Sequence, residues 1–214
     1  MPLQNRVTPA GDIVALPGRG LLMGNRGVLH DDRRHIVRIS QVKRWIACRL
    51  VWRGIRRTLM KPRSYTELFF LDEATAFAAG HRPCAECRHA DYKRFRVLWE
   101  SLFGTVESVD EIDAKLHAER LDGKRKRTLR AGVETLPDGA YVRVDGSACI
   151  VWRGKLATWS DGGYCDFRAI PENMKAEVLT PPSIVAVFRA GYGPGVHPSL
   201  SDALGNAHDL GFFR

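Results

Sequence analysis

Two cysteines separated by two residues, Cys84 and Cys87, are the side chains of this sequence best suited to chemistry. Thiolates at this spacing can bind one metal ion, and zinc favours a tetrahedral set of thiolate and imidazole ligands. A redox pair uses the same spacing, so the motif by itself predicts half of a zinc site. Pro83 suits the first position of a helix, and a helix N-terminus would stabilise the thiolates.

The elements around this pair are predicted to be mainly helical. Asp72 suits the N-cap of a short alanine-rich helix that ends at Gly80, and a second helix is expected from Pro83 to about Phe103. Ser108 and Glu111 have the spacing of a capping box, which predicts a third helix that ends near 122–123. These helices would hold the cysteine pair between them.

Strands are expected on both sides of the helices. The β-branched content of 36–60 predicts a hairpin with its turn at 53–54, whereas the glycine- and proline-rich first thirty residues are predicted to be surface turns. Turn signals from residue 137 onward separate short strands such as 141–144 and 149–152, and a last helix is expected between Thr180 and Gly191.

The resulting fold class is α+β, with an N-terminal zinc module of hairpin and helices followed by a small antiparallel β-rich domain. The predicted segments are a basic zinc-binding domain at 1–107, a helix and basic connector at 108–130, and the β-rich domain with a helix and tail at 131–214.

Cysteine usage and hydropathy predict the compartment. Five cysteines are an odd number, and the sequence shows neither a secretory leader nor an apolar run of the ~20 residues that cross a bilayer. We therefore expect a soluble cytoplasmic protein without a membrane partner, in which metal or thiol chemistry outranks disulfide formation.

The net charge of +9 lies entirely in the N-terminal half, where residues 1–107 hold 19 basic and 10 acidic side chains. Residues 33–66 contain eleven lysines and arginines and no acid, and a second basic run covers 124–127. Such blocks predict a polyanionic partner, DNA or another nucleic acid, although a solvated basic face would look the same. The predicted nucleic-acid-binding residues are Arg33, Arg34, Lys43, Arg44, Arg53, Arg56, Arg57, Lys61, Arg63, Lys124, Arg125, Lys126 and Arg127.

A longer segment carries a family resemblance. Residues 69–88 contain aromatic side chains, an alanine-rich helix that ends in Ala-Ala-Gly, and then Arg-Pro-Cys-x-x-Cys. This pattern resembles the second half of the Ada-type zinc-binding domain, with a match over roughly 48–88. The resemblance implies a zinc site completed by an upstream Cys-Arg-x-x-x-Cys pair, one thiolate of which accepts a methyl group from a DNA methylphosphotriester.

The upstream half of the motif is altered in this chain. Cys48 and Arg49 match the first Cys-Arg, but Trp52 stands where the second cysteine is expected. The implied metal ligands are therefore Cys84, Cys87 and Cys48, with Cys48 also the implied catalytic thiolate. A histidine, a water or a substrate would supply the fourth ligand, and the protein candidates are His30, His35, His81, His89 and His117.

The third predicted helix offers a different chemistry. His117 and Glu119, with the Pro-Cys-x-x-Cys motif, are the parts of a zinc nucleobase deaminase in reversed order, and Asp113 lies one helical turn before His117 and could orient its imidazole. A solvated cluster on an amphipathic helix would show the same residues.

These observations predict a zinc-containing DNA-binding protein that acts in repair or modification of damaged or altered DNA. Two alternatives stay open. One is a zinc-dependent nucleobase hydrolase or deaminase that uses His117 and Glu119, and the other is a non-catalytic zinc-stabilised adaptor for nucleic acid or protein. If the protein is an enzyme of DNA repair or modification, Cys48 is its predicted catalytic residue. If it is a hydrolase or deaminase, the predicted catalytic residues are Asp113, His117 and Glu119.

Overall fold

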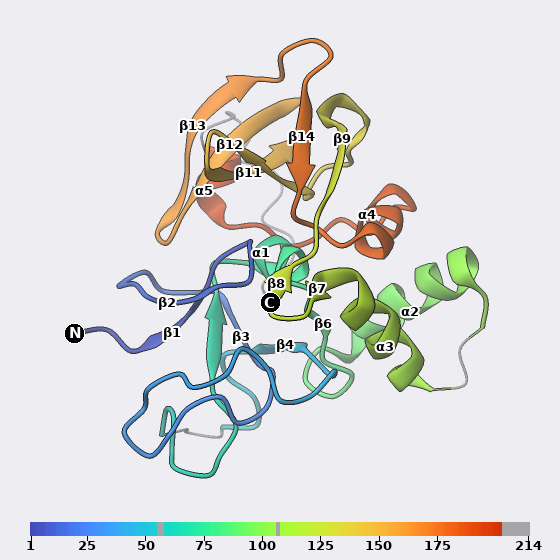
Figure 1. Cartoon of the computed structure of the whole chain (residues 1–214). Coiled ribbons are helices and arrows are strands. Elements are labelled where there is room, and N and C mark those ends of the chain that lie inside the picture. Colours follow the sequence, from blue (N-terminus) through green and yellow to red (C-terminus); the bar gives the residue numbers. More distant parts are fainter. Residues whose placement is uncertain (55–57, 106–107, 203–214) are drawn as a thin grey trace.

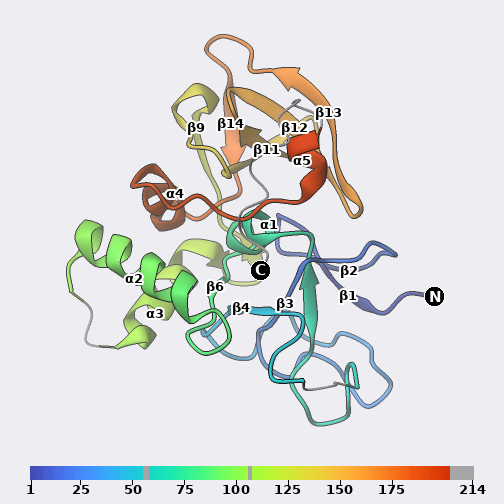
Figure 2. The same cartoon turned by 180° about the vertical axis from the view of Figure 1, so that it is seen from behind.

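A computed structural model describes residues 1–54, 58–105 and 108–202 of the chain. The fold is α+β, with a mixed sheet in the N-terminal half, a six-stranded antiparallel sheet in the C-terminal half, and helices packed where the two sheets meet (Figures 1 and 2). No helix among these residues is long and apolar enough to span a bilayer.

The N-terminal sheet has the order β2-β1-β5-β3-β4-β6. The β1–β5 and β4–β6 pairs are parallel and the other pairs are antiparallel. Its strands are β1 (Gln4–Val7), β2 (Ile13–Ala15), β3 (Leu22–Asn25), β4 (Ile46–Arg49), β5 (Leu68–Phe70) and β6 (Arg82–Pro83).

The C-terminal sheet has the order β13-β12-β11-β10-β14-β9. Its strands are β9 (Leu129–Gly132), β10 (Tyr141–Val144), β11 (Ser147–Trp152), β12 (Lys155–Ser160), β13 (Gly163–Ala169) and β14 (Lys175–Val178). A short 3-10 helix (Val133–Thr135) follows β9. The antiparallel sheet expected after residue 131 is thereby confirmed.

Five helices and one small hairpin complete the described fold. They are α1 (Glu73–Ala78), α2 (His89–Phe103), α3 (Val109–Arg120), α4 (Pro182–Arg189), α5 (Pro198–Asp202) and the hairpin of β7 (Leu121–Asp122) with β8 (Arg125–Lys126). The predicted caps of α1 and α3 are confirmed, because Asp72 accepts a bond from the backbone of Thr75 and both halves of the Ser108–Glu111 capping box form.

Helix α1 lies at the junction of the two halves, and all six of its residues are buried. Its side chains enter three apolar clusters: Phe77 packs against α2, α3 and α4, Ala74 and Ala78 pack against the C-terminal sheet, and Ala76 packs against the N-terminal sheet. The small alanines allow both sheets to approach the helix. The two halves of the chain therefore share their core through α1.

Three expectations about local structure were wrong. The first thirty residues form strands β1, β2 and β3 instead of surface turns. Residues 84–88 form a turn, and α2 begins at His89, because Pro83 is extended in β6 and pairs with Ala47 of β4. Of the expected hairpin, the structure contains one strand, β4, and the turn at 53–54. The stretch 55–57 lies outside the described residues.

Phe77 gives a direct test of the shared core. Its ring lies 5.2 Å from the ring centroids of both Phe188 and Tyr192 and 5.8 Å from that of Phe95. We expect Phe77→Ala to lower the free energy of unfolding by about 3–5 kcal/mol, because it removes packing between both halves at once. Chemical denaturation would measure this loss. Val97→Ala, at an exposed position of α2, is the control and should change stability by less than about 0.5 kcal/mol.

Candidate metal centre

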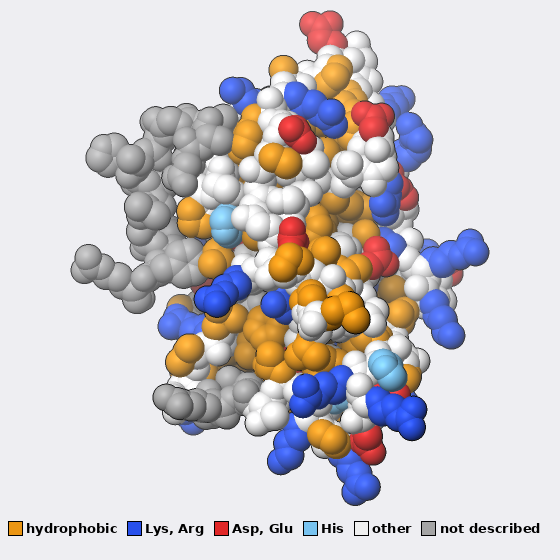
Figure 3. Space-filling model, turned by 90° about the vertical axis from the view of Figure 1, so that its left-hand side faces the viewer, with side chains coloured by type: hydrophobic (Ala, Val, Ile, Leu, Met, Phe, Trp, Pro, Cys, Tyr) orange, Lys and Arg blue, Asp and Glu red, His pale blue; other side chains and the backbone are white. Residues whose placement is uncertain are grey.

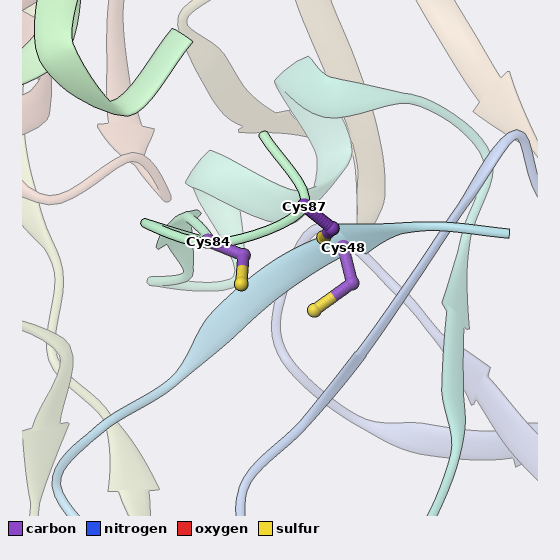
Figure 4. Close-up of side chains that lie close together, drawn as sticks. All are labelled: Cys48, Cys84 and Cys87. Atoms are coloured by element: carbon purple, nitrogen blue, oxygen red, sulfur yellow. The ribbon is translucent and has the colours of Figure 1, made fainter. Parts of the chain in front are cut away.

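Cys48, Cys84 and Cys87 converge on one point although 36 residues separate the first two in the sequence. Their sulfur atoms all lie within 4.8 Å of one another. Figure 4 shows the three side chains directed toward one another, Cys48 from strand β4 and the other two from the turn that follows β6. In a tetrahedral zinc site with Zn–S bonds of about 2.3 Å, sulfurs lie about 3.8 Å apart, so this arrangement needs little contraction to hold a metal.

The sheet brings the three residues together. Strand β4 runs parallel to β6, with Ile46 opposite Arg82, and the backbone N–H of Cys84 donates to the carbonyl of Ala47 at 3.0 Å. Ala47 faces the core, so Cys48, the next residue, points to the other face of the sheet. The chain then turns, and a 3.1 Å bond from the N–H of Arg88 to the carbonyl of Cys84 closes the turn that carries Cys87.

The cluster favours one negative charge and resists more. Hydrogen bonds from the thiols of Cys48 and Cys87, and then from backbone N–H groups of Cys87 and Glu86, lower the pKa of Cys84 well below its usual range. The hydrogen bonds with Cys84 and Cys87 also raise the pKa of Cys48, because its proton is held between the other sulfurs. Three thiolates at this distance need a cation among them. The donor set therefore fits a thiophilic metal such as zinc.

Two buried arginines flank the cysteines, and each is bound to carboxylates. Arg82 donates to both oxygens of Asp113 at 2.9 and 2.8 Å, while Arg88 donates to Glu73 at 2.6 Å and to Asp91 at 2.9 Å. Their charges are therefore largely neutralised, and they fix the ends of the cysteine turn. Sequence reasoning missed these supporting pairs, although an arginine just outside each cysteine was a visible signal.

The structure gives Asp113 a different partner from the expected one. Both of its oxygens bind Arg82, so the carboxylate does not orient His117. The Nδ1 atom of His117 instead lies 3.1 Å from the Arg120 guanidinium, and burial, followed by the charges of Arg120 and Lys43, lowers the pKa of its imidazole. Asp113 is thus a structural anchor for the arginine that precedes the cysteine pair.

Glu119 also has a structural partner. Its two oxygens accept bonds from the hydroxyl of Ser183 at 2.5 Å and from the N–H of Ser183 at 2.9 Å, at the start of α4. This carboxylate therefore caps the start of α4, while the hydroxyl of Thr180 accepts from the N–H of Tyr141. The described structure does not bring His117 or Glu119 into the cysteine cluster.

The predicted nucleic-acid-binding residues fall into three groups: two that lie outside the described residues, those that are exposed, and Lys126, whose side chain is directed inward. Arg56 and Arg57 lie outside the described residues. Most of the others are exposed, some of them in ion pairs, such as Arg44 with Asp110 at 3.3 Å and Arg127 with Asp122 at 3.7 Å. The exposed members are Arg33, Arg34, Lys43, Arg44, Arg53, Lys61, Arg63, Lys124, Arg125 and Arg127.

Lys126 differs from its neighbours in the basic run. Its side chain is directed inward and its ammonium binds the carbonyl of Ala78 at the end of α1. Burial lowers the pKa of this lysine to about 7, and the charges of Arg26 and Arg120 add to the effect. Lys126 therefore supports the fold, whereas Lys124 and Arg125 are exposed.

Comparison with known proteins adds no relative, because no protein-family model, no curated protein and no solved structure matches this chain. The resemblance to the Ada-type zinc domain stays an expectation from the sequence.

Metal content tests the centre directly. We expect the purified protein to bind one equivalent of zinc, and each of Cys48→Ser, Cys84→Ser and Cys87→Ser to weaken binding by at least tenfold, because each removes one of the sulfur donors. Titration against a chromogenic zinc chelator would measure the affinity.

Cys149→Ser is the matched control, since this buried thiol lies in β11 and outside the cluster. Unchanged zinc affinity in all three cluster variants would contradict a metal centre at this place.

Proposed function

We propose that this chain is a zinc-thiolate protein that binds DNA and acts in the repair or modification of damaged or altered DNA, with Cys48 as its reactive thiolate. The convergence of Cys48, Cys84 and Cys87 supports the proposal most strongly. A metal bound there would keep three thiolates deprotonated at neutral pH, and such sulfurs are strong nucleophiles.

Cys48 is best placed to react among the three. It is half-buried, whereas Cys84 and Cys87 are 9% and 7% exposed. The sulfurs of Cys84 and Cys87 also accept backbone N–H groups, which withdraw electron density: Cys84 from Glu86 and Cys87, and Cys87 from Arg49 at 3.4 Å. The groups that affect the charge of the Cys48 sulfur are the thiols of Cys84 and Cys87.

The chemistry implied by the resemblance is alkyl transfer. The thiolate sulfur of Cys48 would attack the methyl carbon of a methylphosphotriester, so that a carbon–sulfur bond forms as the carbon–oxygen bond breaks. The bonding electron pair leaves with the phosphate oxygen, which becomes an ordinary anionic diester. Cys48 ends as a thioether, and no other reactant is required.

The exposed basic residues supply the attraction for DNA. Lysine and arginine side chains gather along the lower edge of the face in Figure 3, the end of the molecule formed by loops of the N-terminal half. The acid-free stretch 33–66 includes Cys48 itself, so the phosphate-binding charges and the reactive sulfur belong to the same part of the fold. Phosphate contacts of this kind hold DNA without reading its sequence.

A non-catalytic adaptor is the second candidate. A metal bound by the three cysteines would join β4 to the turn before α2, and this fastening would stabilise the N-terminal half without any reaction. The hydrolase alternative has less support, since the carboxylates of Asp113 and Glu119 bind Arg82 and Ser183.

Salt dependence tests the DNA partner. Binding of duplex DNA should weaken steeply as salt rises, because released counterions drive it. Replacing two exposed cations in the double variant Arg33→Ala/Lys61→Ala should reduce the slope of log affinity against log salt by up to about 2. Fluorescence anisotropy of labelled DNA would measure the affinity at each salt concentration.

The control is Lys155→Ala, an exposed cation of the C-terminal sheet. Binding that is insensitive to salt, or an equal loss in the control, would remove DNA as the partner of this surface.

Methyl transfer tests the reactive thiolate. The zinc-loaded protein, incubated with DNA that carries methylphosphotriesters, should gain the mass of one methyl group on the peptide that contains Cys48. Cys48→Ser should gain none, and Cys165→Ser, which removes an exposed thiol of β13, should react as the parent does. Peptide mass spectrometry would show which peptide carries the added methyl group. A folded, zinc-loaded protein that binds DNA without transfer would favour the adaptor.

A further inference from the structure

The cysteine cluster has no fourth donor among the described residues. In that part of the chain, Cys48, Cys84 and Cys87 are the whole group of metal-binding side chains whose ligand atoms meet within 4.8 Å. Zinc and cobalt in thiolate sites take four ligands in a tetrahedron, so three sulfurs leave one position to fill.

The candidate histidines are engaged elsewhere. His30 bonds Thr66 and the carbonyl of Lys61, and His81 accepts from Arg26 in the core. The other three are likewise in contact with nearby groups: His35 with Asp31, His89 with the carbonyl of Ala85, and His117 with Arg120.

The cluster lies at the surface on the side of Cys48. This residue is half-buried, and the four neighbours that frame the site, Arg49, Leu50, Ala85 and Glu86, are all exposed. Exposed residues therefore surround the cluster on this side, which is the side from which a small molecule would approach.

Charge and donor softness define the ligand that would fit. Arg49, the residue after Cys48, is exposed, whereas the guanidinium of Arg53 lies 4.0 Å from the carboxylate of Glu86, so these two charges compensate each other. The remaining charge of Arg49 favours an anion. A metal already bound by three thiolates favours a soft donor, and four sulfurs form one of the standard zinc environments.

We infer that the fourth ligand of the metal at Cys48, Cys84 and Cys87 comes from outside the chain, and that this position takes the thiolate of a small thiol. The thiol releases its proton to water as its sulfur binds the metal. The position is exchangeable, so its occupant controls access to the centre. This inference rests on the metal centre of the proposed function and is independent of its DNA partner.

Cobalt spectroscopy tests the inference. The double variant Cys149→Ser/Cys165→Ser, which keeps the three cluster cysteines, is loaded with one equivalent of Co²⁺ and titrated with 2-mercaptoethanol. We expect saturable growth of the sulfur-to-cobalt charge-transfer band by about a third, the ratio of four sulfur ligands to three. Ethylene glycol, which has a hydroxyl in place of the thiol, is the matched probe and should leave the band unchanged. Metal content after desalting must stay at one equivalent.

Three results would overturn the inference. The first is a spectrum that no thiol changes, and the second is a response to inorganic phosphate but not to thiol. The third is a four-ligand spectrum that is present without thiol and lost in the variant Glu107→Ala/Asp202→Ala/His208→Ala/Asp209→Ala, which removes the carboxylate and imidazole side chains that the structure does not describe. Failure to bind Co²⁺ at all would instead count against the metal centre, so the two failures are distinguishable.

Discussion

The complete burial of helix α1 is the constraint on which the rest of the structure depends. A six-residue helix has few internal hydrogen bonds, and most of its backbone groups need partners at the two ends. Asp72 satisfies the first turn, and its other oxygen accepts from the hydroxyl of Tyr164 at 2.5 Å and from the N–H of His197 at 2.9 Å. Burial raises the pKa of this carboxyl, so its hydrogen bonds are needed to hold it in place. The cap of α1 is therefore also a contact between the two halves.

The other end of α1 is closed by cations. Lys126 binds the carbonyl of Ala78, and Arg120 donates to the carbonyl of Gly80 at 2.8 Å, where the negative end of the helix dipole favours positive charge. Gly80 has a φ of 90°, and a Cβ there would lie 2.5 Å from the Cδ of Arg120, so only glycine fits.

The same arginine also contacts Trp45, the residue directly before β4. The guanidinium groups of Arg120 and Arg26 each lie 3.9 Å from the ring of Trp45. The strand that carries Cys48 is thus tied to the end of α1.

Local signals in the sequence predicted the parts of this arrangement that depend on neighbouring residues. The caps at Asp72 and Ser108, the glycine end of α1 and the hairpins of the C-terminal sheet all follow from short-range chemistry.

The sequence could not show that Pro83 pairs with Ala47, because a proline that follows one helix is equally compatible with the start of the next helix. Nor could it show that the carboxylates of Asp113 and Glu119 face Arg82 and Ser183, since those contacts form only when α3 packs against β6 and α4. The convergence of Cys48 with the later pair was predicted only through the family resemblance, as spacing alone does not define it.

The same contacts explain how the cysteine cluster is held in place on one side and meets solvent on the other. Arg88 links the turn after Cys87 to Glu73 of α1, and Glu73 in turn accepts bonds from the hydroxyl of Tyr192 at 2.8 Å and from the N–H of Gly195 at 2.9 Å. Cys84 and Cys87 are therefore fixed by groups that reach into the C-terminal half. Cys48 is the least buried residue of the cluster, and it lies on a strand whose next residues, Arg49 and Leu50, are exposed. Because the buried arginines are already paired with carboxylates, they add little positive charge at the sulfurs. A metal ion bound by the three sulfurs would then have to stabilise the thiolates, and the chemistry of the centre would depend on that ion.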